Sequence, residues 1–440
     1  MTPSPFDSAL LGPLLGDADA AEILSETRFV AHMITVEGAL ARACGSVGLI
    51  PQDSAGRISR VLSQTHIDPQ DLGAGTAAAG VPVPALVKRL QAELGQDGQF
   101  VHWGATSQDI VDCAHALQWR DMLDLLAARV AQVLDALQSA SDGHAQTLMA
   151  GRTRSQVATP ISFGLRIATW AQPLIALEQA LPDLRARLLR VQFGGASGSA
   201  SAVGGHAAAL SAALAQQLDL ADGPCWHTDR SAIVALGGWL AAVSAALAKA
   251  ARDLVIMGRS EISEARAGQG GGSSTMPQKS NPVAAEAVIT LADWIACLQP
   301  ALARAASPLE ERDGAAWALE WLALPQMGIA TAAALRHALG LIQSVTADPA
   351  RMAAQLDAGN GAALAEAASF ALAAYMPRPE AQDVVKAALA RAREDGISLP
   401  QALDLLDASR GLTDWTATLS AQSQLAASEV MRTRILAQRR

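Results

Sequence analysis

The stretch from Ile110 to Val130 has the sequence IVDCAHALQWRDMLDLLAARV. Its apolar residues recur every three to four positions, which is the spacing of one face of an α-helix. Alanine and leucine, both strong helix formers, dominate the whole chain, whereas β-branched and aromatic residues are sparse. No stretch alternates apolar and polar residues for long enough to predict a sheet. We therefore expect an all-α fold.

Glycine and proline gather in only a few places, and the segments between them are long enough for long helices. At 1.5 Å per residue each of these helices would be on the order of 40 Å long. Helices this long and this apolar need partners on several faces, so we expect the chain to form an oligomer through its middle. We predict three helical domains, the second being a central long-helix bundle, over residues 1–107, 108–345 and 346–440. The long helical stretches are predicted at roughly 108–142, 160–191, 229–265, 282–306 and 314–342.

The composition excludes several classes of protein. Of 440 residues, 50% are hydrophobic and 17% charged, so the chain has enough apolar surface to fold and is not a disordered protein. Four cysteines cannot form a disulfide framework for a chain of this length. A formal charge of −9 argues against nucleic acid as a partner. A site for an anionic substrate would need a local concentration of positive charge.

One segment, from Ser231 to Ala248, is uncharged and long enough to resemble a membrane span. It is flanked by Arg230 and Lys249 and has no comparable second segment, and a helix that is apolar all round also suits the interior of a large bundle. We expect a buried helix and no membrane partner. The N-terminus shows no secretion signal, so we expect a cytoplasmic protein with reduced cysteines.

Standard constellations for metals and nucleophiles are not found in the sequence. Cys113 and His115 lack the spacing of metal ligands, and no serine lies in a G-x-S-x-G turn. The glycine-rich run that begins at Gly270 lacks the glycine that precedes the lysine of a phosphate loop. We expect neither a metal ion nor an organic cofactor.

The informative segment is Gly272–Pro282, with the sequence GSSTMPQKSNP. A loop rich in glycine and serine can close over a ligand, and Pro282 is suited to start a helix after it. Lys279 supplies a positive charge and Asn281 a neutral donor. Both suit a carboxylate, or the enolate formed beside one. The alternative interpretation is a flexible surface loop.

Three segments together resemble the fumarase/aspartase superfamily. GSSTMPQKSN at 272–281 is similar to its signature loop, HWGATSQD at 102–109 to its H-x-G-x-T-S-x-D segment, and GRTRSQVATP at 151–160 to its G-R-T-x-x-Q-x-A-x-P segment. The resemblance covers nearly the whole chain. It implies a helical homotetramer whose active sites each take residues from three subunits, and a small polycarboxylate as substrate.

Within the superfamily, the chain is most similar to the cycloisomerases of bacterial protocatechuate degradation, through Trp103-Gly104-Ala105 and the segment around Trp226. The resemblance implies that a carboxylate of the substrate adds across a double bond to form a lactone. Lyases of the superfamily have a histidine where this chain has Arg154. Arginine stays protonated and cannot carry a proton, but it can bind a carboxylate through two hydrogen bonds. An exposed surface charge is the alternative interpretation of Arg154.

Two other functions stay open at this point. One is an elimination lyase that acts on adenylosuccinate or another succinyl adduct, and the lack of histidine at Arg154 weighs against it. The other is a non-catalytic structural protein on the same fold, as some lens crystallins are. The intact Ser273, Lys279 and Asn281 favour catalysis.

The resemblance also implies roles for individual residues. Ser273 is the expected general acid, with Ser274 as the alternative, and Lys279 and Asn281 would stabilise the enolate-like intermediate. His102 would contact the substrate or be a core histidine, and Arg312 would reach a carboxylate or lie in an exposed salt-bridged corner. His227 and Arg230 would line the cleft or, more plainly, cap a helix, and Glu286 would orient Lys279 or His102. Hydrogen bonds to the substrate are expected from Thr106, Ser107, Thr153 and Gln156.

Overall fold

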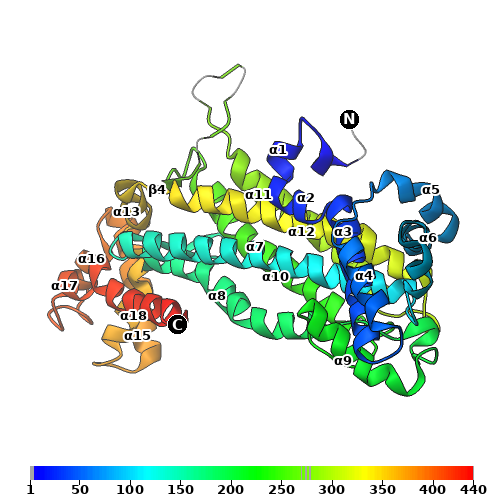
Figure 1. Cartoon of the computed structure of the whole chain (residues 1–440). Helices are drawn as coiled ribbons and strands as arrows, with labels where there is room; N and C mark the ends of the chain where they lie inside the picture. The colour runs from blue at the N-terminus through cyan, green and yellow to red at the C-terminus, as the bar shows by residue number, and fades with distance from the viewer. Residues whose placement is uncertain (1–3, 269, 273–274, 277–278, 440) are drawn as a thin grey trace. The chain divides into compact units, whose positions relative to one another are not determined.

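The computed structural model describes residues 4–268, 270–272, 275–276 and 279–439. Helices make up most of this part of the chain, which confirms the all-α class (Figure 1). Four of the five long helices begin and end within about three residues of the predicted bounds. The fifth was predicted over 229–265 but ends at Met257, and residues 258–264 form turns that include a left-handed Ser263. The long helices are α7 (Ser107–Gly143), α8 (Phe163–Leu188), α10 (Ser231–Met257), α11 (Val283–Ala305) and α12 (Gly314–Gln343).

The contacts within the chain divide it into two compact units. Unit 1 comprises Met1–Val130, Leu177–Ala245 and Thr290–Arg336. Unit 2 comprises Ala131–Ala176, Ala246–Ile289 and His337–Arg440. The long helices therefore contribute residues to both units. The division into three sequence domains stays a prediction.

Unit 1 contains the shorter N-terminal helices and the segments around α9. Ser25 caps helix α3 by accepting a hydrogen bond from the amide of Arg28, and Asp17 caps α2 in the same way at Ala20. The α-helices are α1 (Gly12–Leu15), α2 (Ala18–Ile23), α3 (Glu26–Ser46), α4 (Gln52–Leu62), α5 (Gln70–Ala79), α6 (Val83–Leu94) and α9 (Ala207–Leu218). The 3₁₀ turns are η1 (Pro5–Asp7), η2 (Gly95–Phe100), η3 (Gly195–Ser197) and η4 (Gly204–His206).

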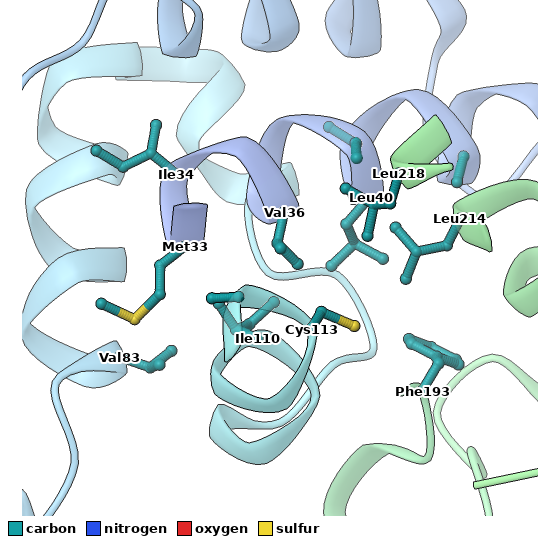
Figure 2. Close-up of a cluster of buried hydrophobic side chains, with 14 of the residues drawn as sticks. Met33, Ile34, Val36, Leu40, Val83, Ile110, Cys113, Phe193, Leu214 and Leu218 are labelled. Atoms are coloured by element: carbon teal, nitrogen blue, oxygen red, sulfur yellow. The ribbon is translucent and has the colours of Figure 1, made fainter. Parts of the chain in front are cut away.

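A buried apolar cluster in unit 1 holds α3 against the first turns of α7. Figure 2 shows Val36 and Leu40 of α3 beside Ile110 and Cys113 of α7, all of them almost completely buried. Phe193 joins the same cluster immediately before a glycine-rich loop. Burying side chains of this size stabilises a fold by roughly 1.5–3 kcal/mol each. The cluster thus anchors the chain on both sides of the segments 102–109 and 194–199.

Unit 2 contains an antiparallel hairpin that the sequence did not predict. Strands β1 (Leu148–Thr153) and β2 (Gln156–Ser162) pair Thr153 with Gln156, which leaves a two-residue turn at Arg154 and Ser155. Both turn residues have positive φ, 49° and 64°. Such turns are usually marked by Asn-Gly or Asp-Gly. The prediction that no stretch forms a sheet is wrong here, because this turn carries neither signal.

The rest of unit 2 is a short strand pair and a group of C-terminal helices. Trp415 is fully buried in this group and donates its indole N–H to the carbonyl of Ser409 at 2.9 Å. The strands are β3 (Ala265–Arg266) and β4 (Thr346–Ala347). The helices are α13 (Pro349–Asp357), η5 (Ala362–Leu364), α14 (Ala365–Leu372), α15 (Arg378–Asp395), α16 (Leu399–Leu405), α17 (Trp415–Thr418), η6 (Ala421–Gln424) and α18 (Leu425–Leu436).

Among the described residues, three helices have the length and hydropathy of membrane spans, so the expectation that 231–248 has no comparable second segment is wrong. In the most apolar windows of α10 and α12, 61% of the residues are buried within the chain. In the corresponding window of α11 only 28% are buried. The apolar windows of α10 and α12 are therefore mostly buried within the chain, whereas most of the α11 window is not.

Candidate active site

The segment 102–109 in unit 1 is a tight loop that leads into α7. His102 and Gly104 both have positive φ, 62° and 71°. Only glycine fits at position 104, because an added Cβ would lie 2.4 Å from Cγ1 of Val203. Thr106 and Ser107 follow at the start of α7 and are half-buried. The close packing explains why this loop keeps one shape.

Asp109 holds this loop and a second loop together. One carboxylate oxygen, Oδ2, accepts hydrogen bonds from the amides of Thr106 and Gly195, each at 2.9 Å. The other, Oδ1, accepts from the amide of Gly194 at 2.9 Å and contacts Nε2 of His227 at 2.8 Å. Four partners on one buried carboxylate hold the two loops in fixed positions relative to each other.

His227 is buried and acts as the charged partner of Asp109. Burial alone would lower its pKa, but the hydrogen bond to Asp109, with a contribution from the nearby Cys225, outweighs burial and raises the pKa to about 9. The expectation that His227 caps a helix is wrong. Asp229 takes that role, since its Oδ1 accepts from the amide of Ser231 at the start of α10.

Arg230 also does not cap α10, and its side chain is buried in an ionic network. Its guanidinium donates to Asp112 at 2.8 and 3.2 Å and to Glu320 at 2.8 and 2.5 Å. Burial acts to raise the pKa of Asp112, but Arg230 outweighs it and the pKa falls below the usual value. The network ties α10, α7 and α12 together and gives Arg230 a structural role in unit 1.

Arg312 donates hydrogen bonds to the loop that contains Gly194 and Gly195. Its Nη2 donates to the carbonyl of Ala196 at 2.9 Å and more weakly to that of Gly195 at 3.4 Å. Among the residues that the structure describes, Arg312 has backbone carbonyls and no carboxylate as partners, so the exposed salt-bridged corner is wrong for this residue. Its buried Nε has no hydrogen-bond partner there either. An arginine so held has N–H groups left for a carboxylate.

His102 pairs with a carboxylate from α3 that the sequence did not reveal. Its Nδ1 lies 2.7 Å from Oε1 of Glu37, and its amide donates to Oε2 of the same residue at 3.1 Å. Burial acts to lower the pKa of His102, but the charge and hydrogen bond of Glu37, with a contribution from Asp109, raise it. The expectation that Glu286 orients His102 is wrong, because Glu37 holds this histidine.

In unit 2 the hairpin presents three of the predicted residues to solvent. Thr153, Arg154 and Gln156 are all exposed, at and beside the turn. Below them, Arg152 forms a two-pronged ion pair with the fully buried carboxylate of Glu264, at 2.8 and 2.7 Å. This pair anchors the strand that carries Thr153, so the tip projects from a fixed base.

The signature loop also belongs to unit 2. The amide of Gly271 donates to the carbonyl of Asn281 at 2.8 Å, and the amide of Asn281 donates back at 2.9 Å, so the loop is closed at its base. The Lys279 side chain is exposed. Ser273 and Ser274 lie outside the described residues. Glu286 is exposed in the first turn of α11.

The predicted residues thus fall into two groups. In unit 1, the structure connects the loop of His102, Thr106 and Ser107 through Asp109 and Gly195 to Arg312. Thr153, Arg154, Gln156, Lys279 and Asn281 belong to unit 2. Among the described residues, no group of three or more histidine, cysteine, aspartate or glutamate side chains is arranged to hold a metal ion.

Comparison with known proteins identifies the family. Residues 17–296 match the family model described as Lyase. The 3-carboxy-cis,cis-muconate cycloisomerase of Acinetobacter baylyi is 36% identical over 393 residues, which cover 87% of each chain. That of Pseudomonas aeruginosa is 37% identical over 381 residues, 84% of this chain and 83% of the relative. The crystal structure of the 3-carboxy-cis,cis-muconate lactonizing enzyme from Pseudomonas putida is 34% identical, with a TM-score of 0.91 over 98% of this chain and 99% of that one. The chain belongs to the lyase family of the fumarase/aspartase superfamily.

Proposed function

We propose that this chain is an enzyme that converts 3-carboxy-cis,cis-muconate into 4-carboxymuconolactone, an intramolecular lyase of protocatechuate degradation. Members of the superfamily act on small carboxylates, and four relatives at 35–37% identity are cycloisomerases of this kind. The observation that carries the proposal within the chain is Arg154. It stands exposed at the tip of the hairpin in the segment where lyases have a histidine.

The reaction needs one carbon–oxygen bond and one proton. A carboxylate oxygen attacks the double bond, the π electrons move toward the carbon beside another carboxylate, and an enolate-like intermediate forms. Ser273 donates a proton to that carbon and regains one from water. No group leaves, so the product is an isomer of the protonated substrate. Lys279 and Asn281 stabilise the negative charge that develops during the attack.

Charge complementarity supports a role for arginine in place of histidine. The substrate carries three carboxylates, and only one of them is consumed by lactonisation. The other two need cationic or strongly donating partners. Arg154 and Arg312 supply guanidinium groups, and Thr106, Ser107, Thr153 and Gln156 supply hydrogen-bond donors. A histidine at position 154 can transfer the proton of an elimination, whereas this addition takes its proton from Ser273.

The functional unit in this proposal is a cytoplasmic homotetramer with active sites shared between subunits and without a metal ion or cofactor. The exposed apolar surface of α11 supports it, because only 28% of its most apolar window is buried within the chain. The exposed side chains Trp294, on α11, and Leu322, on α12, belong to the same pattern. A helix face of this kind is covered when subunits pack.

The test is turnover by two neighbouring serine variants. Ser273→Ala is expected to lower kcat by at least about a hundredfold, since general acid catalysis contributes that much or more. Ser274→Ala is the matched control and is expected to keep kcat within about threefold. Circular dichroism and sedimentation check that both variants fold and assemble as the unsubstituted chain does. A Ser273→Ala variant with near-normal kcat contradicts the assignment of the acid.

A further inference from the structure

The contact between α3 and the loop at 102 places a buried carboxylate beside an apolar cluster. Glu37 is completely buried on α3. Val36 and Leu40 of the same helix pack in the apolar cluster. Its carboxylate holds His102 twice, at the amide and at Nδ1. A buried carboxylate is expensive to keep in an apolar core unless it is fully paired. Here both oxygens are used by one residue.

His102 is itself in a constrained conformation. Its φ of 62° is unusual for a residue other than glycine or asparagine. The side chain keeps 20% of its surface exposed, whereas that of Glu37 has none. Because Nδ1 is bound by the carboxylate, Nε2 is the other ring nitrogen available to a ligand. The described residues contain no hydrogen-bond partner for it.

We propose that Glu37 is a positioning residue for the reaction, which holds the ring of His102 so that its Nε2–H binds a carboxylate of the substrate. The inference rests on the proposed function, because it needs a polycarboxylate in the site. A charged donor binds a carboxylate more strongly than a neutral one. Glu37 does not touch the substrate; it acts through His102.

The charges that face His102 come from two helices. Glu37 approaches from α3 and Asp109 from α7, and both favour the charged ring, while burial opposes it. Asp109 is already occupied by Thr106, Gly194, Gly195 and His227. Removing the charge of Glu37 while keeping its shape therefore leaves mainly burial acting on His102. The imidazole of a Glu37→Gln variant is expected to be neutral at pH 8.

Two measurements on the full-length chain test the proposal. The first is a ¹³Cε1-histidine NMR titration, in which the His102 signal among the eight histidines is assigned by its loss in His102→Asn. Asparagine tolerates the left-handed backbone at this position. We expect His102 to lose its proton at a higher pH in the unsubstituted chain than in Glu37→Gln. Identical titration of His102 in the two proteins overturns the proposal.

The second measurement is steady-state kinetics with 3-carboxy-cis,cis-muconate at pH 6 and pH 8. Glu37→Gln is expected to raise KM about tenfold at pH 8 with kcat within about twofold, and the difference from the normal KM is expected to narrow as the pH falls. In the His102→Asn background the same substitution is expected to leave KM unchanged. An equal rise in KM in both backgrounds overturns the proposal, because Glu37 would then not act through His102.

A matched control removes a different carboxylate. Asp253→Asn neutralises the carboxylate that accepts the Trp170 indole N–H at 2.8 Å in unit 2. It is expected to leave KM and its pH dependence unchanged, and thermal unfolding reports whether each variant folds. Failure of the unsubstituted chain to turn over this substrate would count against the proposed function alone, since the NMR titration still decides whether Glu37 charges His102.

Discussion

At the scale of single residues, two imidazole–carboxylate pairs in unit 1 have different surroundings. The pair of His227 and Asp109 is almost completely buried, with side chains 3% and 1% exposed, and it joins two loops. The pair of His102 and Glu37 has one buried member and one partly exposed member. The same chemistry therefore joins two loops in the first pair and, in our proposal, directs a ring nitrogen to a substrate carboxylate in the second.

The raised pKa of His227 predicts how stability depends on pH. A histidine whose pKa is higher in the folded state stabilises the fold fully below its unfolded pKa, which is about 6.5. That contribution is lost as the pH rises through about 9. On the order of 3 kcal/mol of unfolding free energy is at stake, because each pKa unit corresponds to about 1.4 kcal/mol.

Denaturant unfolding of the unsubstituted chain and of His227→Gln between pH 6 and pH 10 measures this effect. The difference in unfolding free energy is expected to shrink as the pH rises through 9. His206→Gln, at an exposed position, is the control and should show no such trend. A difference that stays constant over this range would mean that the charge of His227 does not stabilise the fold.

At the scale of elements, the hairpin turn is strained because neither Arg154 nor Ser155 is a glycine. An L-residue in the left-handed region costs about 1–2 kcal/mol relative to its relaxed conformation. Ser155→Gly is expected to raise the unfolding free energy by up to about 1 kcal/mol, which thermal unfolding can measure. Ser139→Gly, at an exposed position inside α7, is the matched control and should lower stability instead. A fall in stability for both variants would contradict the strained turn.

The long helices were predictable from the sequence, whereas the hairpin and the charge pairs were not. The spacing of apolar residues after Ile110 is local information, and α7 follows it. The hairpin has no turn signal, since its left-handed residues are arginine and serine. Glu37 lies 65 residues from His102 along the chain, so only the packing of α3 on α7 brings them together.

The contacts of the loop residues in 102–109 could not be predicted from the sequence either. The motif containing Thr106 and Asp109 was recognised by resemblance, but the sequence offered no role for Asp109. Its four partners include the amides of Gly194 and Gly195, which carry no side-chain signal. The carboxylate-binding role of Arg154 stays a prediction, which rests on comparing a charged residue at a motif position with the histidine of the lyases.

At the scale of the whole molecule, the predicted site residues are divided between the two units, and one long apolar helix is left largely uncovered. The proposed sharing of active sites between subunits predicts complementation. Arg154→Ala and Ser273→Ala are each expected to be nearly inactive. Mixing them under conditions that exchange subunits should raise activity about tenfold over either parent, because some sites then contain both intact residues.

The assay of that mixture needs a control in which each variant is exchanged with itself. Sedimentation velocity before and after mixing is expected to show assemblies of four 45.4 kDa chains. A tetramer without any gain in activity would mean that Arg154 and Ser273 of one site come from the same subunit. A monomer would contradict the shared site altogether.

The most direct test of the central claim is the ultraviolet absorbance of 3-carboxy-cis,cis-muconate mixed with the purified protein, with adenylosuccinate assayed in parallel. Lactonisation removes the conjugated diene, so its absorption band is expected to collapse within minutes while adenylosuccinate stays intact. Cleavage of adenylosuccinate with the diene band unchanged would contradict the account and identify an elimination lyase that works without the usual histidine.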